Sequence, residues 1–118
     1  MWEIAVQKTP IAYLELPSTD VAASKQFYGS LFGWSFQNWG PDYAAFSDAG
    51  LEGGLNAEAA SRTKAPLIVL QTDDLEAMAA RIAPAGGTIT VPIFSFPGGR
   101  RFHFTDPSGQ ELAVMQCA

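Results

Sequence analysis

The sequence has few of the residues that most often carry enzyme chemistry. Its 118 residues include one cysteine, Cys117, and one histidine, His103. A single cysteine excludes an internal disulfide, and no base lies beside Cys117 in the sequence, so we interpret it as a buried or incidental thiol. His103 is the one side chain whose ordinary pKa lies near neutrality, so any imidazole chemistry must use it.

Basic residues and long apolar runs are also scarce. Seven Lys and Arg stand against twelve Asp and Glu, which gives a net charge of −5 at pH 7. A protein that binds the phosphate backbone needs a basic surface, so we expect no nucleic-acid partner. No apolar run approaches the length of a membrane span, and residues 1–8 lack the pattern of a signal peptide. We therefore expect a cytoplasmic protein that does not bind membranes.

The chain does have enough apolar residues for one globular domain over residues 1–118. Hydrophobic residues make up 47% and charged residues 16% of the sequence, which is typical of folded rather than disordered chains. Residues 1–9 form an arm in which Trp2, Ile4 and Val6 alternate with other residues. This alternation favours an edge strand or a contact with a partner.

The order of elements predicts a strand, a helix and three strands, twice in succession. In the first copy a strand over 11–16 precedes a helix over about 21–31, which Asp20 can cap and Gly33 ends. Strands follow at about 34–39, 43–47 and 51–55, and a polar linker covers 56–65. The second copy has a strand over 67–70, a cap at Asp74 and a helix with an apolar stripe. Its further strand material lies at 88–91, 94–96, 102–105 and 112–116.

The two copies align at a shift of 54 residues, which places Leu14 on Ile68 and Asp20 on Asp74. We predict two modules, about 10–56 and 66–117. Neither module could bury its sheet alone, so the two should pair into one layer or an incomplete barrel with the helices outside. A ferredoxin-like α+β sandwich is the alternative, but it has fewer strands per helix.

A predicted hairpin closes the second module. Asp106-Pro107-Ser108-Gly109 suits a type I turn between two apolar-rich runs. One arm carries His103 and the other carries the carboxylate of Glu111.

Three segments resemble the vicinal oxygen chelate superfamily, which includes glyoxalase I, the bleomycin and fosfomycin resistance proteins and the extradiol dioxygenases. The segments are 14–20 with "FY" at 27–28 and "LFGW" at 31–34, then 72–75 with Gly86-Gly87, and finally 104–112. The resemblance implies an α+β fold of two βαβββ modules that form a U-shaped, partly open barrel around a cavity. It also implies a homodimer, because members of the superfamily are often dimeric.

The same resemblance locates the metal ligands of the family. Metal-using members usually place His where this chain has Tyr13 and Leu67, and Glu where it has Ala113. Divalent metals need several converging imidazoles or carboxylates. We therefore expect no metal and no other cofactor at the usual site, with a displaced divalent metal as the alternative.

The candidate site lies on one face of the sheet. Tyr13 and Glu15 share a face by the period of two, and Glu15 interrupts an apolar strand, so it needs a partner such as Arg101. The resemblance places His103 in the cavity, and a neighbouring carboxylate would favour its imidazolium form. Aromatic residues between 34 and 46 could line a pocket, although such residues more often form a core. The predicted ligand-binding residues are Tyr13, Glu15, Trp34, Phe46, Arg101, His103, Glu111 and Met115.

Two functions stay open at this point. One is binding of a small planar or aromatic molecule in the cavity without the usual metal. The other is a lyase, isomerase or dioxygenase-type activity that uses His103 with Glu15 or Glu111 as catalytic residues. The ordinary alternative is that His103 is a structural strand histidine, and whether the protein is an enzyme is left open.

Overall fold

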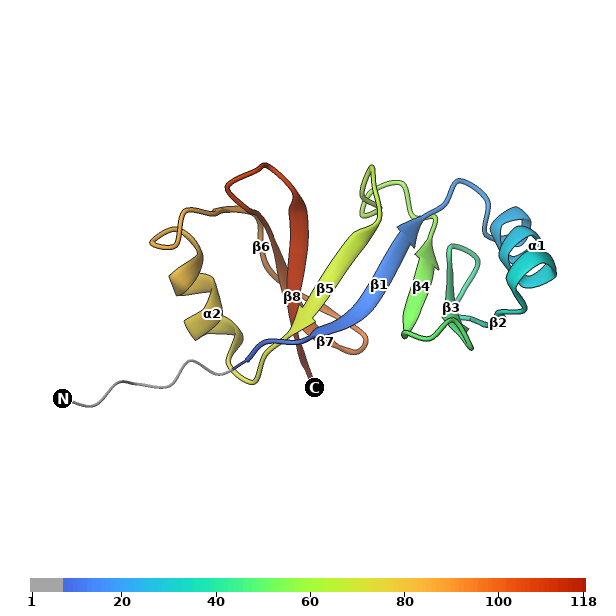
Figure 1. The fold of residues 1–118 in the computed structure, drawn as a ribbon, viewed down its shortest axis with the longest axis horizontal. Helices are drawn as coiled ribbons and strands as arrows, with labels where there is room; N and C mark the ends of the chain where they lie inside the picture. The colour runs from blue at the N-terminus through green and yellow to red at the C-terminus, as the bar shows by residue number, and fades with distance from the viewer. Residues whose placement is uncertain (1–7) are drawn as a thin grey trace.

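We analysed a computed structural model, which describes residues 8–118, so the arm with Trp2, Ile4 and Val6 lies outside the described part. Within residues 8–118 the chain forms two helices and eight strands (Figure 1). In chain order they are β1 (Ile11–Pro17), α1 (Val21–Phe32), β2 (Ser35–Asn38), β3 (Tyr43–Ser47), β4 (Gly53–Asn56), β5 (Leu67–Gln71), α2 (Leu75–Ile82), β6 (Thr88–Phe96), β7 (Gly99–Thr105) and β8 (Glu111–Cys117). Neither helix is long and apolar enough to cross a membrane.

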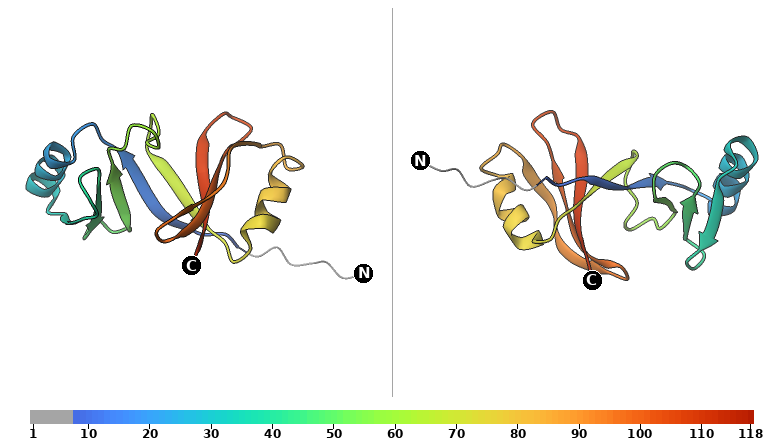
Figure 2. Two further views of the ribbon diagram at one scale, coloured as in Figure 1. Left: turned by 180° about the vertical axis from the view of Figure 1, so that it is seen from behind. Right: turned by 60° about the horizontal axis from the view of Figure 1, so that its bottom comes forward.

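The strands form one open sheet in the order β2-β3-β4-β1-β5-β8-β7-β6. β1 and β5 pair antiparallel at its centre, and the two helices lie at opposite ends of the molecule (Figure 2). The radius of gyration is 15.6 Å, larger than the roughly 13 Å of a compact domain of about 100 residues. The predicted α+β class and the open sheet are confirmed, and each half supplies four strands and one helix.

The sequence repeat appears directly in the contacts. Leu14 pairs with Ile68 across the β1–β5 ladder, so the residues that match at a shift of 54 face each other. Asp20 caps α1 by accepting a hydrogen bond from the Ala23 amide at 3.1 Å, and Asp74 caps α2 from the Ala77 amide at 3.1 Å. An approximate two-fold axis therefore passes near the Leu14–Ile68 pair.

β6 differs from the prediction of two short strands at 88–91 and 94–96, because residues 88–96 form one strand with two register shifts, between Ile89 and Val91 and between Val91 and Phe94. Val91 pairs with His103 and Phe94 pairs with Arg101, so three steps along β6 match two steps along β7. A β-bulge of this kind adds a residue and turns the following side chains over. It places Val91 and Phe94 on the same face of the sheet despite their odd spacing.

The two helices are covered to different degrees. The apolar core between α2 and the sheet contains Leu75, Ile82, Phe102 and Val114, which are all buried. α1 instead touches the sheet through aromatic rings: Tyr28 stacks on Trp34 with ring centroids 4.9 Å apart, and the ring centroids of Trp34 and Phe46 are 4.8 Å apart with the rings tilted. Its outer face stays open to solvent, with exposed fractions of 55% for Phe27, 62% for Leu31 and 58% for Phe32.

Candidate functional site

The face of the sheet opposite the helices carries the polar residues of interest. Glu15 on β1 pairs with Leu67 on β5, and His103 on β7 pairs with Ala113 on β8. These four strands are neighbours in the sheet, in the order β1-β5-β8-β7. The middle of this face is apolar: Leu67, Val69 and Ala113 form a buried cluster, against which Tyr13 and Met115 pack. The polar side chains therefore form two groups on either side of an apolar floor.

The first group is a buried ion pair between the two halves of the chain. Both terminal nitrogens of Arg101 on β7 donate to the two carboxylate oxygens of Glu15 on β1, at 3.3 Å each. The pairing of Glu15 with Arg101 that the sequence suggested is thus confirmed. The side chains are only 11% and 6% exposed, and the pair reaches across β8 and β5. Fork-to-fork geometry of this kind fixes orientation as well as charge.

Neutral donors complete the environment of Glu15. The Tyr43 hydroxyl donates to it at 3.3 Å, and the Asn56 amide donates to its other oxygen at 3.4 Å. Tyr13 and Tyr43 share a hydrogen bond of 2.6 Å. Burial raises the pKa of both tyrosines, and for Tyr43 the negative charge of Glu15 adds to the effect, so both phenols keep their protons.

Aromatic rings cover the guanidinium of Arg101. Its central carbon lies 5.3 Å from the ring centroid of Phe94 and 5.7 Å from that of Phe96, within the range of cation–π attraction. Its Nε is buried without a hydrogen-bond partner among the described residues. The network holds Arg101 as an internal cation with Glu15 as its counter-charge.

The second group is a His–carboxylate pair on the closing hairpin. Asp106 starts the predicted turn, with its carbonyl accepting from the Gly109 amide at 2.9 Å, and this turn sets His103 and Glu111 as diagonal neighbours. Nδ1 of His103 lies 3.0 Å from a carboxylate oxygen of Glu111. His103 is 3% exposed, and its Nε2 is buried and has no partner within residues 8–118.

The charge state of His103 differs from the sequence-based expectation of an imidazolium. Burial lowers the pKa of His103 below its ordinary value of 6.5, and the charge of Arg101 lowers it further. The hydrogen bond to Glu111 acts in the opposite direction but does not offset burial. Glu111 thus acts on the pKa of His103 in the expected direction, but the sequence did not show the depth of the ring, whose burial has the larger effect.

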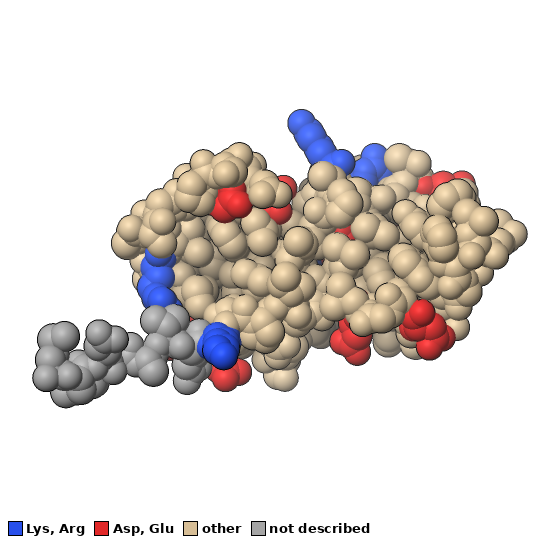
Figure 3. Space-filling model, viewed as in Figure 1, with Lys and Arg blue, Asp and Glu red and all other residues tan. Residues whose placement is uncertain are grey.

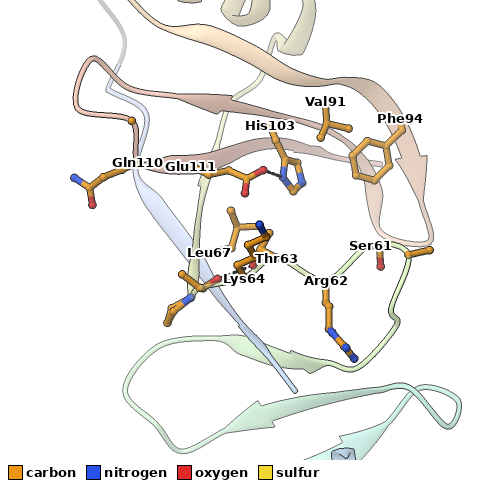
Figure 4. A pocket seen from close by; sticks show the side chains of 14 residues that line it. Ser61, Arg62, Thr63, Lys64, Leu67, Val91, Phe94, His103, Gln110 and Glu111 are labelled. Atoms are coloured by element: carbon orange, nitrogen blue, oxygen red, sulfur yellow. Dashed lines mark hydrogen bonds and ion pairs between the residues drawn. The ribbon is translucent and has the colours of Figure 1, made fainter. Parts of the chain in front are cut away.

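A cavity of about 770 Å³ opens beside His103 (Figure 4). The loop over residues 60–66 forms one wall, and β6, β7 and the start of β8 form the other. Its 14 lining residues are Ala60, Ser61, Arg62, Thr63, Lys64, Ala65, Pro66, Leu67, Val91, Phe94, His103, Gly109, Gln110 and Glu111. Cavities of this size are typical of small-molecule sites.

The structure separates the predicted site residues into three groups. His103 and Glu111 line the cavity. Glu15 and Arg101 belong to the buried ion pair, with Tyr13 hydrogen-bonded to its partner Tyr43 and Met115 packed on the apolar floor. Trp34 and Phe46 pack against each other on the α1 side of the sheet. Phe46 pairs with Gly53, whereas Glu15 pairs with the next residue, Gly54, so Phe46 and Glu15 lie on opposite faces. Trp34 and Phe46 do not line this cavity.

Sequence reasoning missed several contributors to the site. The loop over 60–66 was interpreted as a linker, but Arg62 anchors it by donating to the backbone carbonyls of Ser18 and Ala57. Val91 and Phe94 were missed because a bulge cannot be recognised from alternation alone. Asn56 gave no signal, because its partner Glu15 lies 41 positions away in the sequence.

The residues present do not fit the metal site of metal-using relatives. The usual ligand positions hold Tyr13, Leu67 and Ala113, of which two are apolar and the third is a neutral phenol. Gly54 on β4, the last strand of the first half, has no side chain that could bind a metal, and the Tyr43 hydroxyl occupies the space where such a side chain would lie. Within residues 8–118 no three His, Cys, Asp or Glu side chains gather as a metal site would require.

Comparison with known proteins shows which family this is. The profile of the Glyoxalase/Bleomycin resistance protein/Dioxygenase superfamily matches residues 10–114. The crystal structure of a superfamily member from Vibrio splendidus 12B01 superposes with a TM-score of 0.69 at 17% identity, over 92% of this chain and 99% of that one. The chain therefore belongs to this superfamily.

Two relatives are closer in sequence. CFP32 of Mycobacterium tuberculosis (strain CDC 1551 / Oshkosh), which carries a provisional glyoxylase name, is 33% identical over 93% of this chain and 46% of its own length. The anthracycline biosynthesis protein DnrV of Streptomyces peucetius is 31% identical over 87% of this chain and 45% of its own length. The chain thus spans less than half the length of these relatives.

The ion pair makes a first prediction. Replacing Arg101 by Leu leaves the Glu15 carboxylate buried without its counter-charge, and we expect a loss of about 3–5 kcal/mol in the free energy of unfolding. Urea unfolding measures the loss. Arg100→Leu is the matched control, because Arg100 pairs with Glu76 at the surface and its loss should matter little. The double replacement Glu15→Met with Arg101→Met should lower the free energy of unfolding less than Arg101→Leu alone does, because it leaves no unpaired charge. Equal losses of stability in Arg100→Leu and Arg101→Leu would contradict the prediction.

The state of His103 makes a second prediction. We expect NMR titration of this single histidine to give a pKa below 6.5, and Glu111→Gln to lower it further by removing the carboxylate. Glu52→Gln, at the equivalent place before β4, serves as the control. Because the folded state disfavours protonation of His103, the free energy of unfolding should decrease as the pH falls below about 6.5, where the histidine of the unfolded chain takes up its proton. His103→Gln should abolish that part of the pH dependence. A pKa above 6.5 would contradict this reasoning.

Proposed function

We propose that the protein binds a small planar or aromatic molecule in the cavity beside His103, without a metal at the usual family site. The observation that carries the proposal is the buried Nε2 of His103, which has no hydrogen-bond partner among the described residues and belongs to a cavity wall that also contains Val91 and Phe94. A few placed polar groups in an apolar pocket are what small-molecule sites typically present. Val91, Phe94 and Leu67 supply the apolar surface for a flat ligand.

The charged groups around the site support this assignment. The buried Arg101 guanidinium already has the Glu15 carboxylate as its partner, so Arg101 does not need an anionic ligand. On the face of the molecule that Figure 3 shows, Lys and Arg form no single large basic patch. The relative DnrV is named for anthracycline biosynthesis, and anthracyclines are planar aromatic compounds, which agrees with a ligand of that shape.

A lyase or isomerase is the second candidate, and one observation favours it. Glu111 orients His103 through Nδ1, burial lowers the pKa of the ring so that it stays neutral, and Nε2 has no hydrogen-bond partner among the described residues. A general base needs a fixed ring and a ring nitrogen whose lone pair is not already used. Glu15 does not fit the same role, because four donors already surround its carboxylate.

The exposed apolar face of α1 supports a homodimer as the functional form. Phe27, Leu31 and Phe32 share this face and are each more than half exposed. Contiguous apolar surface of this kind usually marks an interaction site. A second copy is the occupant we propose, because the superfamily to which the chain belongs has many dimeric members.

The binding proposal predicts that blocking the cavity abolishes binding of flat probes. We expect wild-type protein, treated with EDTA and then dialysed, to bind naphthalene-type probes in calorimetry and to gain thermal stability with them. Val91→Trp should fill the cavity and remove binding, whereas Thr90→Trp at the exposed neighbouring position should not. Metal analysis of protein purified without chelator should find no stoichiometric divalent ion. Binding that requires added metal, or that survives Val91→Trp, would contradict the proposal.

The dimer proposal predicts a mass of twice 12.6 kDa in light scattering at micromolar concentration. Leu31→Glu places a charge in the α1 face and should convert the dimer to monomer. Ala22→Glu, on the opposite side of the same helix, is the control and should leave the mass unchanged. A monomer mass for the wild type would refute the proposal.

A further inference from the structure

The position of the His103 proton determines which ligand chemistry the cavity can recognise. We propose that the ligand presents a hydroxyl of phenol or enol type, which donates a hydrogen bond to Nε2 of His103. This inference rests on the proposed function, because it specifies the class of molecule bound at the same site.

The hydrogen bond to Glu111 fixes which ring nitrogen carries the proton. An ionised carboxylate can only accept, so at 3.0 Å the Nδ1 atom must be the donor. The buried ring keeps one proton rather than two, since burial and the nearby guanidinium both lower the pKa of His103. Nε2 therefore presents a lone pair, and a ligand group that meets it must donate.

The location of Nε2 makes the ligand its natural partner. The atom is buried, has no partner within the described chain, and belongs to a ring in the cavity wall. In Figure 4 the ring of His103 lies between Glu111 and the apolar pair Val91 and Phe94. The centroids of His103 and Phe94 are 5.8 Å apart, so a flat ligand lying on Phe94 would bring its edge to the imidazole.

The charges around the imidazole select among donors. The charged groups near it are Glu111 from β8, Arg101 from β7, Glu15 from β1, and Arg62 and Lys64 from the loop over 60–66. Arg101 is held on the same face two residues away, and it disfavours an ammonium donor. A carboxylate, ketone or ether offers only acceptors, which would face the lone pair of Nε2. A phenol or enol is neutral, donates strongly, and any negative charge that develops on its oxygen is favoured by the nearby guanidinium.

A set of three naphthalenes tests the inference. The probes are 2-naphthol, 2-methoxynaphthalene and naphthalene, titrated into the full chain by calorimetry near pH 7.5. The methyl ether keeps the ring and the oxygen but removes the donor. We expect 2-naphthol to bind roughly tenfold tighter than its methyl ether, as one hydrogen bond in a buried site would give. His103→Phe keeps a flat ring at this position and should make the two affinities equal, while binding of naphthalene persists.

A second measurement needs no variant. The chain has a single histidine, so its ¹⁵N signals are assigned without ambiguity. In the free protein near pH 7.5, Nδ1 should carry the proton and Nε2 should show the signal of a bare ring nitrogen, and 2-naphthol should shift Nε2 more than 2-methoxynaphthalene does.

The outcomes separate this inference from the proposed function. Equal affinity for 2-naphthol and its methyl ether, or a proton on Nε2 in the free protein, would overturn the hydroxyl inference while leaving aromatic binding intact. Failure of all three naphthalenes to bind would overturn the proposed function, and the hydroxyl inference with it.

Discussion

The ion pair between Glu15 and Arg101 is the interaction on which the geometry of the binding face depends. Its members come from β1 and β7, 86 positions apart in sequence, and they meet above the apolar floor of β5 and β8. Two charges withdrawn from water contribute little net stability, but removal of one of them is costly. The pair therefore acts mainly as a constraint, because it joins β1 of the first half to β7 of the second across β5 and β8, and β7 also carries His103.

The same pair changes what the superfamily fold can do in this chain. The usual metal ligands are replaced by Tyr13, Leu67 and Ala113, while Tyr43 fills the space above Gly54. Positive charge on this face comes instead from a guanidinium that is permanently bound to a carboxylate. A bound metal can offer an open coordination position to a substrate, whereas both terminal nitrogens of Arg101 already donate hydrogen bonds to Glu15. The proposed ligand contact therefore lies at His103, two residues further along β7, rather than at this network.

The fold could be predicted from the sequence because its signals are local. Capping by Asp20 and Asp74, the turn at 106–109 and the shift of 54 residues all depend on short segments, and each is present in the structure. The site was only partly predictable, because it depends on long-range placement. The pairing of Glu15 with Arg101 could be guessed from an isolated carboxylate in an apolar strand. The bulge in β6, the wall formed by residues 60–66 and the burial of His103 could not, since none of them leaves a periodic pattern.

The two polar groups differ in how completely their hydrogen bonds are satisfied. Around Glu15, every carboxylate oxygen has donors, and the network joins side chains of β1, β3, β4 and β7. At His103, one ring nitrogen is fixed by Glu111 and the other has no partner within the described residues. A buried polar atom without a partner costs free energy, whereas a ligand that supplies the missing hydrogen bond recovers it. The satisfied group therefore serves as scaffold, and the unsatisfied one is the point at which this face can gain free energy by binding.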